Sequence, residues 1–436
     1  MSSRIIAGID VGSSKLSTII AQASPEEGKI SIIGASSVPS AGVRKGQIVN
    51  IEEATAGIIS SVEAAERMAG YSISQTFVSL GGAHIASQNS KGVVAVAEPE
   101  GEITPEDVKR VIEAARAISL PSSREIVHCL PRYFIVDSQD GIKDPVGMTG
   151  VRLEVETHLI TGSSTSMRNL AKCVSEVGAD IQELVFSGLA SAEAVLTETE
   201  KELGVILVDI GGGTTEIMIF VEGAPAYTAV LPIGAKNVTN DLAIGLRLSL
   251  ESAEKLKLHL SEKQKEITLP EEEVSLAETK ERKEEKDTID LGKLGIYEDT
   301  KTVSRKTLIE GIIKPRLNEI FTMVGLEIKK SGFGGMTPSG IVLTGGGALT
   351  SGVIESAKRV LAMPVRIGVP SGFSGLVDDV LTPAYAASLG LVLYGSKNFD
   401  EGSSKISFPG FGKFAQKIPV GGLYKKALDF IKALLP

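Results

Sequence analysis

The sequence has few aromatic side chains and an excess of negative charge. Of its 436 residues, 4% are aromatic and none is tryptophan, so base stacking on single-stranded nucleic acid would have few side chains available. The formal net charge of −9 also argues against a general binder of the nucleic-acid phosphate backbone. We therefore expect that nucleic acid is not a partner.

Disulfide-forming and metal-ligating residues are scarce as well. Cys129 and Cys173 cannot make a disulfide framework, and neither a CxxC nor an HExxH spacing occurs. The four histidines lie far apart in the sequence: His84, His128, His158 and His259. A structural metal site is therefore not expected.

Long apolar runs are also missing. No segment reaches the roughly 18 consecutive apolar residues of a transmembrane helix, and the N-terminus lacks the basic region, apolar stretch and cleavage site of a signal peptide. With 42% hydrophobic and 23% charged residues, the composition is that of an ordinary globular protein, and the length predicts about two to four structural units. We expect a cytoplasmic protein that contacts a membrane only from its surface.

Two similar hairpins lie about half a chain apart. Residues 4–20 form an apolar strand, a polar turn that begins at Asp10, and a second strand. Residues 205–220 repeat this order around Asp209, again with small residues in the turn. This repetition predicts an internal duplication in which each half is a sheet with helices.

The region between the hairpins, residues 82–162, follows a different pattern. Thr104 is a plausible N-cap, with Pro105 at the first helical position and Asp107 three residues after the cap. Apolar residues then recur with helical spacing, and strand-like runs follow at 125–136 and 152–160. We interpret this region as an inserted α+β subdomain.

Two later segments carry a clear charge or helical pattern. Residues 262–290 contain 11 acidic and 6 basic side chains with few large apolar ones, which predicts an exposed loop. Residues 304–320 show helical spacing of apolar residues, and Pro315 is expected to bend or interrupt that helix.

The C-terminal end has the pattern of a tethered amphipathic helix. A stretch rich in Gly, Ser, Lys and Pro precedes residues 422–436, which have one apolar and one basic side. Such a short helix needs a surface to fold against, and five lysines and one aspartate from position 411 onward give this end a net charge of +4. An anionic lipid surface is the predicted partner, although packing on the protein's own core is an alternative. The expected membrane residues are Leu423, Tyr424, Lys425, Lys426, Leu428, Ile431, Lys432, Leu434 and Leu435.

Three loops have the composition of a phosphate-binding site. Loop 1 (residues 10–15) and loop 2 (residues 209–215) each combine an aspartate at a strand end with small residues whose amides can face a polyphosphate. The aspartates could hold a hydrated Mg²⁺. Loop 3 (residues 344–348) follows a strand with three glycines, which permit close approach of the backbone to a base or phosphate. Each loop alone could be structural, but their order and spacing together indicate a nucleotide site.

At this point the sequence resembles the superfamily of actin, heat-shock chaperones and sugar kinases, whose two related halves bind ATP between them. The resemblance implies that Asp10 and Asp209 position Mg-ATP, with Mg²⁺ bound through water. It also implies that Glu254 and Lys257 contact ribose and base, although such a pair is otherwise an ordinary exposed one. The implied cofactor-binding residues are Gly12, Ser13, Ser14, Lys15, Gly211, Gly212, Gly213, Thr214, Thr215, Gly234, Glu254, Lys257, Gly345, Gly346, Gly347 and Ala348.

Within this superfamily the sequence is most similar to the FtsA family of bacterial actin-like cell-division proteins. The residues that carry this similarity are 144–154, 303–305, 312–316, 383–391 and the amphipathic end. The similarity implies an α/β, two-lobed, duplicated actin-like fold, in which an inserted α+β subdomain replaces actin's usual second lobe and a C-terminal amphipathic helix follows. One departure is the segment 262–290, which is longer and more charged than the family core requires.

The resemblance and the patterns together predict a division of the chain. The first half comprises 1–81 and 163–203, with the inserted subdomain at 82–162; the second half comprises 204–240 and 336–394, with a lobe at 241–335; a linker at 395–421 and the membrane helix at 422–436 follow.

The family resemblance also implies function and partners. It implies a protein that binds ATP, polymerises on the cytoplasmic face of the inner membrane at the division site, anchors the tubulin-like FtsZ ring and helps recruit later division proteins through the inserted subdomain. The expected site for the C-terminal peptide of FtsZ is the helix at 304–320, through Arg305, Lys306 and Arg316.

Hydrolysis of ATP is expected to be slow or negligible. Actin-like ATPases orient the attacking water with a polar side chain before the second phosphate loop, and residues 186–193 offer Ser187 and Glu193. Two other classes remain open from the sequence: a PilM-like adaptor of pilus machinery, which would lack the amphipathic end, and a phosphotransferase of the sugar kinase branch, which would need a substrate pocket and a general base.

Overall fold

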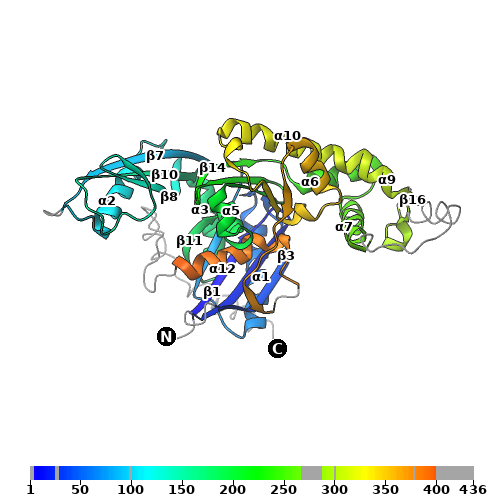
Figure 1. Cartoon of the computed structure of the whole chain (residues 1–436). Helices are drawn as coiled ribbons and strands as arrows, with labels where there is room; N and C mark the ends of the chain where they lie inside the picture. Colours follow the sequence, from blue (N-terminus) through cyan, green and yellow to red (C-terminus); the bar gives the residue numbers. More distant parts are fainter. Residues whose placement is uncertain are drawn as a thin grey trace, which may run out of the picture.

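The computed structural model describes residues 4–24, 29–97, 101–266, 287–298, 301–376 and 379–398. The predicted membrane helix at 422–436 and most of the predicted linker lie outside these residues. Three sheets organise the described chain, and the inserted subdomain and the lobe that carries α7 and α9 lie at opposite ends of the molecule in the view of Figure 1.

The first sheet has six strands in the order β11-β6-β1-β2-β3-β19. Their bounds are β1 (Arg4–Val11), β2 (Lys15–Ser24), β3 (Lys29–Pro39), β6 (Gln75–Leu80), β11 (Asp180–Phe186) and β19 (Phe373–Gly375). The helices of this half are α1 (Ile51–Ala69), α3 (Ser164–Ser175), α4 (Ser187–Val195), α5 (Glu198–Leu203) and α12 (Ala386–Asn398). A small hairpin, β4 (Val43–Arg44) with β5 (Gln47–Ile48), precedes α1.

The second sheet has five strands in the order β14-β13-β12-β17-β18. Their bounds are β12 (Val205–Ile210), β13 (Thr215–Val221), β14 (Ala224–Leu231), β17 (Ile341–Thr344) and β18 (Val365–Ile367). The main helices here are α6 (Ala235–Leu246), α7 (Leu250–Glu266), α9 (Arg305–Leu308), α10 (Lys314–Ser331) and α11 (Val353–Leu361). Short elements complete this half: β15 (Thr288–Asp290), η1 (Leu291–Leu294), β16 (Thr302–Ser304), η2 (Ile309–Ile313), η3 (Gly334–Met336), η4 (Gly346–Leu349) and η5 (Pro383–Tyr385).

The two sheets share one topology. In each half three antiparallel strands follow one another, and a later strand returns parallel to the first of them: β6 beside β1, and β17 beside β12. A fifth strand then adds in parallel, β11 beside β6 and β18 beside β17. The duplication that the two hairpins predict is therefore confirmed. β19 is the exception, because it comes from the C-terminal part of the chain and extends the first sheet.

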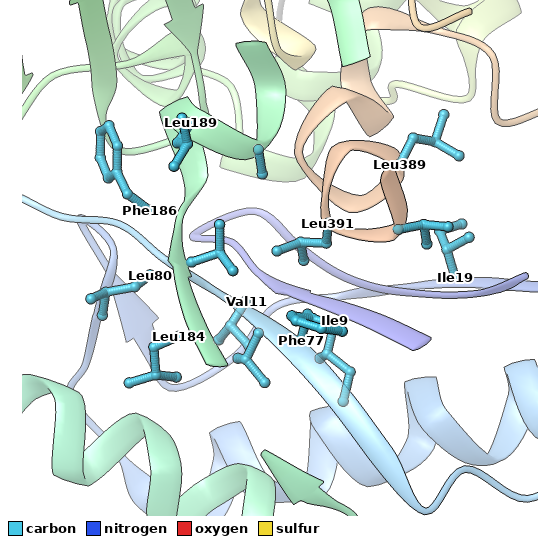
Figure 2. Packing of buried hydrophobic residues seen from close by; sticks show 14 of the residues in the cluster. Ile9, Val11, Ile19, Phe77, Leu80, Leu184, Phe186, Leu189, Leu389 and Leu391 are labelled. Carbon is cyan, nitrogen blue, oxygen red and sulfur yellow. The ribbon is translucent and has the colours of Figure 1, made fainter. Parts of the chain in front are cut away.

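Helices α4 and α12 lie close to each other and to the first sheet. A Cβ atom added to Gly390 of α12 would lie 1.7 Å from the carbonyl oxygen of Ala190 in α4, so the two backbones pack together with no room for a side chain. In Figure 2, Leu391 of α12 lies over the strands that carry Ile9 and Phe77. All three residues belong to the first core, which is the hydrophobic core around the six-stranded sheet.

The inserted subdomain has its own sheet and core. Its strands are β7 (Ala86–Ala95), β8 (Arg124–Val136), β9 (Gln139–Ile142) and β10 (Arg152–Ser163), in the order β7-β10-β8-β9. Helix α2 (Pro105–Arg116) packs on this sheet and begins with the predicted N-cap: Thr104 and Asp107 form a capping box, with Pro105 at the first helical position. The Asp107 carboxylate accepts hydrogen bonds from the main-chain N–H and the hydroxyl of Thr104, and these bonds lower its pKa to about 2.

Two predictions about local structure need correction. The predicted loop at 262–290 is helical at its start, because α7 runs to Glu266, and it ends in strand β15, which pairs with β16. The predicted linker begins too early, since α12 continues to Asn398. The prediction that Pro315 bends or interrupts its helix is confirmed, because a π-helical turn, η2, lies just before it. A proline crowds the carbonyl four residues earlier, and the wider turn relieves that crowding.

Candidate functional site

A cavity of about 270 Å³ lies where the two halves meet. Strands β1, β12 and β17 end at this place, so loops 1, 2 and 3 converge there. Because the two halves are related, corresponding strand ends of the two sheets face the same cavity. The volume is slightly below the roughly 300–1,000 Å³ of typical small-molecule pockets.

Most of the residues predicted for the nucleotide site line this cavity. They are Asp10, Gly12, Ser13, Ser14, Lys15, Asp209, Gly211, Gly212, Thr214, Glu254, Lys257, Gly345, Gly346 and Gly347. Four others do not line it: Gly213, Thr215, Gly234 and Ala348. The Thr215 hydroxyl donates a hydrogen bond to the Ile233 carbonyl. Ala348 is buried in the second core, which is the hydrophobic core around the five-stranded sheet.

Loops 1 and 2 have the same turn and touch each other. The Gly12 N–H donates to the Lys15 carbonyl at 3.1 Å, and the Gly211 N–H donates to the Thr214 carbonyl at 2.9 Å. A Cβ atom added to Gly212 would lie 1.9 Å from Ser14 Oγ. Glycine at position 212 of loop 2 therefore leaves the space that the Ser14 side chain of loop 1 occupies.

The two loop aspartates are each held by a serine. The Ser79 hydroxyl donates to Asp10 Oδ1 at 2.7 Å, and the Ser191 hydroxyl donates to Asp209 Oδ2 at 2.5 Å. Burial raises the pKa of both carboxyls, although the serines oppose the shift, and the charge of Asp10 adds to the shift at Asp209. Carboxylate oxygens are the ligands that Mg²⁺ accepts, so this end of the cavity fits a hydrated divalent cation.

Lys15 is the partly buried cation of loop 1. Burial lowers its pKa to about 8, while Asp10 and Asp209 oppose this shift. Its ammonium group lies 3.2 Å above the centre of the Tyr385 ring, a cation–π contact that compensates part of the lost hydration. A desolvated lysine beside two phosphate-type loops fits a polyphosphate chain.

Glu216 is a cavity residue that sequence reasoning missed. It lies on β13, is 6% exposed, and accepts from the Ser187 hydroxyl at 2.6 and 2.8 Å. Burial raises its pKa, and the nearby charge of Asp209 adds to the shift. The available signal was an ionisable residue inside a run of otherwise apolar or small strand residues.

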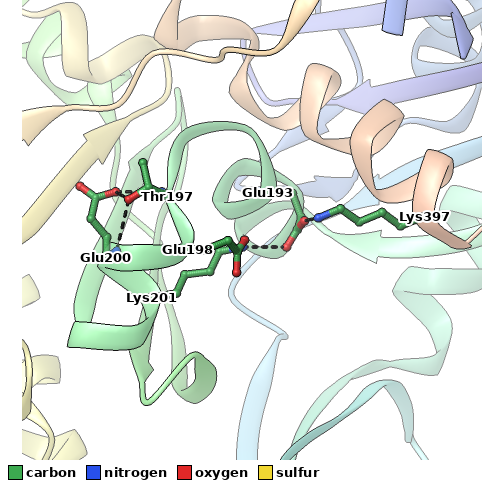
Figure 3. Close-up of polar contacts among 6 residues, drawn as sticks. All are labelled: Glu193, Thr197, Glu198, Glu200, Lys201 and Lys397. Carbon is green, nitrogen blue, oxygen red and sulfur yellow. Dashed lines mark hydrogen bonds and ion pairs between the residues drawn. The ribbon is translucent and has the colours of Figure 1, made fainter. Parts of the chain in front are cut away.

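Of the two candidates for orienting water, the structure places only Ser187 at the cavity. Glu193 lies further along α4 and pairs with Lys201 at 3.2 Å and with Lys397 at 2.5 Å, as Figure 3 shows. Glu193 therefore connects α4 to the end of α12 instead of facing the cavity.

Glu254 and Lys257 form an ion pair on α7. A pair with this spacing is usually exposed on a helix surface, but this one is less exposed. The Lys257 ammonium donates to Glu254 Oε2 at 2.7 Å and to the Thr239 hydroxyl at 2.9 Å. Lys257 is 7% exposed, because α7 packs against α6. Three further polar side chains of the lining were also missed: Lys236, Ser261 and Thr350.

The expected partner residues lie on α9 and α10, away from the cavity. Arg316 binds both carboxylate oxygens of Asp241, at 2.6 and 2.9 Å, and so ties α10 to α6. Arg305 donates to the Leu260 carbonyl at 2.8 Å, and Lys306 is exposed. Two of the three cations thus already have partners within this lobe.

The expected membrane residues, which lie between Leu423 and Leu435, are outside the described residues. In the part of the chain that the structure describes, no helix has both the length and the apolar character needed to cross a bilayer.

Two sheets of one topology, with their loops meeting over a shared cavity, define an actin-like protein that carries an inserted α+β subdomain. The model of the SHS2 domain inserted in FtsA matches residues 82–161, and the model of cell division protein FtsA matches residues 206–390. Cell division protein FtsA of Pseudomonas aeruginosa is 37% identical over 420 residues, which cover 96% of each chain. The chain belongs to the FtsA family of cell division proteins.

One further comparison supports the family and another supports the fold. FtsA of Borreliella burgdorferi is 42% identical over 394 residues, covering 90% of this chain and 91% of the relative. The solved PilM-PilN type IV pilus biogenesis complex superposes with a TM-score of 0.60 at 15% identity, over 89% of this chain and 98% of that chain. The likeness to the PilM-PilN complex shows the fold alone. Family membership therefore rests on the FtsA relatives, which favour neither the PilM-like adaptor nor the sugar-kinase branch.

Proposed function

We propose that this FtsA-family chain binds Mg-ATP in the cavity between its halves and uses it to assemble on a membrane. The observation that carries the proposal is the convergence of loops 1, 2 and 3 on one cavity that contains Asp10, Asp209 and Lys15. Bound Mg²⁺ would neutralise phosphate charge beside the two aspartates. Loop amides and Lys15 would bind the phosphate chain, and Glu254 and Lys257 would contact the nucleoside.

Nucleotide binding is tested by titrating the full chain with ATP in the presence and absence of Mg²⁺. We expect Asp10→Asn and Asp209→Asn each to weaken Mg-ATP binding at least tenfold, because each removes a charge that faces the cation. Asp144→Asn, on the inserted subdomain, is the matched control. Equal affinity with and without Mg²⁺ would contradict the assigned role of the aspartates.

Slow hydrolysis is part of the same proposal. The Ser187 hydroxyl, which could orient a water molecule, is already committed to Glu216. We expect little phosphate release from the purified chain with Mg-ATP. Fast Mg²⁺-dependent release that disappears in Asp209→Ala would instead establish an efficient ATPase.

Membrane attachment is supported by the sequence of residues 422–436. A buried Leu or Ile contributes about 1.5–3 kcal/mol, and a lysine near an anionic surface about 1 kcal/mol, so one helix is a marginal anchor. A polymer presents many such helices, and their avidity makes attachment strong. Co-sedimentation with anionic liposomes should require these residues. A chain that ends at Gly421 and still pellets with liposomes would overturn the assignment.

The proposed partner at the division site is the C-terminal peptide of FtsZ, with attachment at the cytoplasmic face of the membrane. Lys306 is the best residue to test, because it is exposed while Arg305 and Arg316 hold the lobe together. Lys306→Glu should weaken peptide binding and leave ATP affinity intact. Lys358→Glu, exposed on α11, should change neither, and unchanged peptide affinity in Lys306→Glu would discard the site. Recruitment of later division proteins through the inserted subdomain remains a proposal from the family resemblance.

A further inference from the structure

Lys236 contacts both phosphate-type loops at once. It is the second residue of α6, and its main-chain N–H donates to the Gly212 carbonyl of loop 2 at 2.9 Å. Its side chain crosses to the other half, where the ammonium group donates to the Ser13 carbonyl of loop 1 at 2.6 Å. One residue therefore connects the two loops, and it also lines the cavity between them.

The charged neighbours of Lys236 are two cations and one anion. Its hydrogen-bond acceptor is a neutral carbonyl, and Lys257 and Arg44 are neighbouring cations. Glu254 is the nearby anion, but its carboxylate already accepts from Lys257 and from Thr239. Lys236 is exposed, but loss of part of its hydration lowers its pKa; Glu254 opposes this shift, whereas Lys257 and Arg44 add to it. An ammonium in such a place is better stabilised by a phosphate than by a carbonyl.

Lys15 does not fill the same role. Its ammonium lies above the Tyr385 ring, and its opposing charges are Asp10 and Asp209. The two lysines thus belong to different parts of the cavity: Lys15 stands among the carboxylates, and Lys236 stands where the loops meet.

We infer that Lys236 is a phosphate-binding residue that closes loops 1 and 2 on a nucleoside triphosphate in preference to a diphosphate. The inference rests on the proposed nucleotide binding. Binding of the phosphate chain between the loops replaces the carbonyl acceptor with an anionic oxygen, and the triphosphate offers more negative charge than the diphosphate. Because the main chain of Lys236 stays bound to loop 2, this contact joins the halves through the ligand.

The test measures the affinities of the full chain for Mg-ATP and Mg-ADP by calorimetry. Lys236→Met keeps the length of the side chain without its charge, and Lys236→Arg keeps the charge. We expect Lys236→Met to weaken ATP binding at least tenfold and ADP binding about threefold or less, and Lys236→Arg to retain most of the preference for ATP. Salt should weaken ATP binding less in Lys236→Met than in the wild type.

Controls separate this role from a structural cross-link. Lys255→Met is the matched variant, since Lys255 is exposed on α7 and pairs with Glu251 at 2.8 Å, and it should leave both affinities unchanged. Loss of ATP and ADP affinity by the same factor in Lys236→Met, or no loss of either, would overturn the inference. If Lys236→Met fails to fold, the folded Lys236→Arg decides: the inference fails if Lys236→Arg loses the preference for ATP. A wild-type chain that binds neither nucleotide would refute the proposed function itself.

Discussion

Loops 1 and 2 share a backbone turn and differ in the side chains that it presents. In both, the N–H of the first glycine donates to a carbonyl three residues later, and an aspartate precedes the turn. Loop 1 carries Ser13 and Ser14, whereas loop 2 carries glycines at the facing positions. The difference is complementary, because the hydroxyls of loop 1 occupy the space that side chains on loop 2 would need.

The paired strands behind these loops show a second difference. In the first half Asp10 lies opposite Ser17 in the strand register, and in the second half Asp209 lies opposite Glu216. Both partners meet a serine of a helix: Ser17 bonds to Ser388 of α12 at 2.7 Å, and Glu216 accepts from Ser187 of α4. The duplicated backbone thus carries a neutral residue in one half and an ionisable one in the other.

The largest effect is expected from adding a side chain to loop 2. Gly212→Ala should destabilise the protein by roughly 2–3 kcal/mol and weaken Mg-ATP binding more than 100-fold, because its Cβ would overlap Ser14 Oγ. Combining it with Ser14→Gly should recover at least half of the lost stability, as thermal unfolding of a double-mutant cycle would show. Gly335→Ala, where a Cβ has open space, is the control. If the double variant is no more stable than Gly212→Ala, the loops do not complement each other in this way.

The next effect concerns Lys15, whose counterpart in loop 2 is the neutral Thr214. Since the pKa of Lys15 is about 8, phosphate binding must raise it, and binding above that pH requires uptake of a proton. Because of Lys15, Mg-ATP affinity should fall by up to tenfold per pH unit above pH 8. Lys15→Met should bind more weakly and lose this dependence between pH 7.5 and 9.5. The same pH profile in both proteins would assign the titration to another group.

A smaller effect is expected at Glu216, the counterpart of Ser17. Burial raises the pKa of Glu216 above its ordinary value of 4.5, so the folded chain retains a proton that the unfolded chain has released. This contribution to stability is complete below pH 4.5 and is lost as the pH rises through the raised pKa. Glu216→Gln should therefore flatten the fall of the unfolding free energy with pH and stabilise the chain by roughly 1–2 kcal/mol at pH 9. Denaturant unfolding at several pH values measures this; parallel curves for the two proteins would rule the carboxyl out.

The smallest effect is expected where α4 and α12 are tied together at their ends. Glu193 pairs with Lys397, whose side chain is 59% exposed, and with Lys201, whose side chain is 7% exposed. Lys397→Ala should cost less than about 1 kcal/mol, because an exposed ion pair contributes little. Lys201→Ala should cost more, since it leaves a partly buried carboxylate without its buried partner. A larger loss for Lys397→Ala in denaturant unfolding would contradict this ranking.

Features determined by residues near one another in the chain could be predicted from the sequence. The two hairpins around Asp10 and Asp209 and the N-cap at Thr104 follow from strand patterns, turn residues and a capping box. The glycines of loops 2 and 3 are also adjacent in the chain, and they indicate close approach of the backbone to a ligand. Boundaries were predicted less accurately: the exposed-loop and linker predictions overlooked the last turn of α7 and that of α12, where each helix continues after its apolar residues have ended.

The sequence by itself determined the duplication, the two aspartates and the glycine-rich loops, because each depends on a few adjacent residues and their preferred backbone angles. Only the tertiary structure decided which side chains meet. Lys236 reaches a carbonyl 223 residues away in the sequence, and Glu216 accepts from a serine 29 residues away on another element. Such contacts depend on how the halves pack against each other, and that packing brings together buried charges whose partners no local pattern reveals.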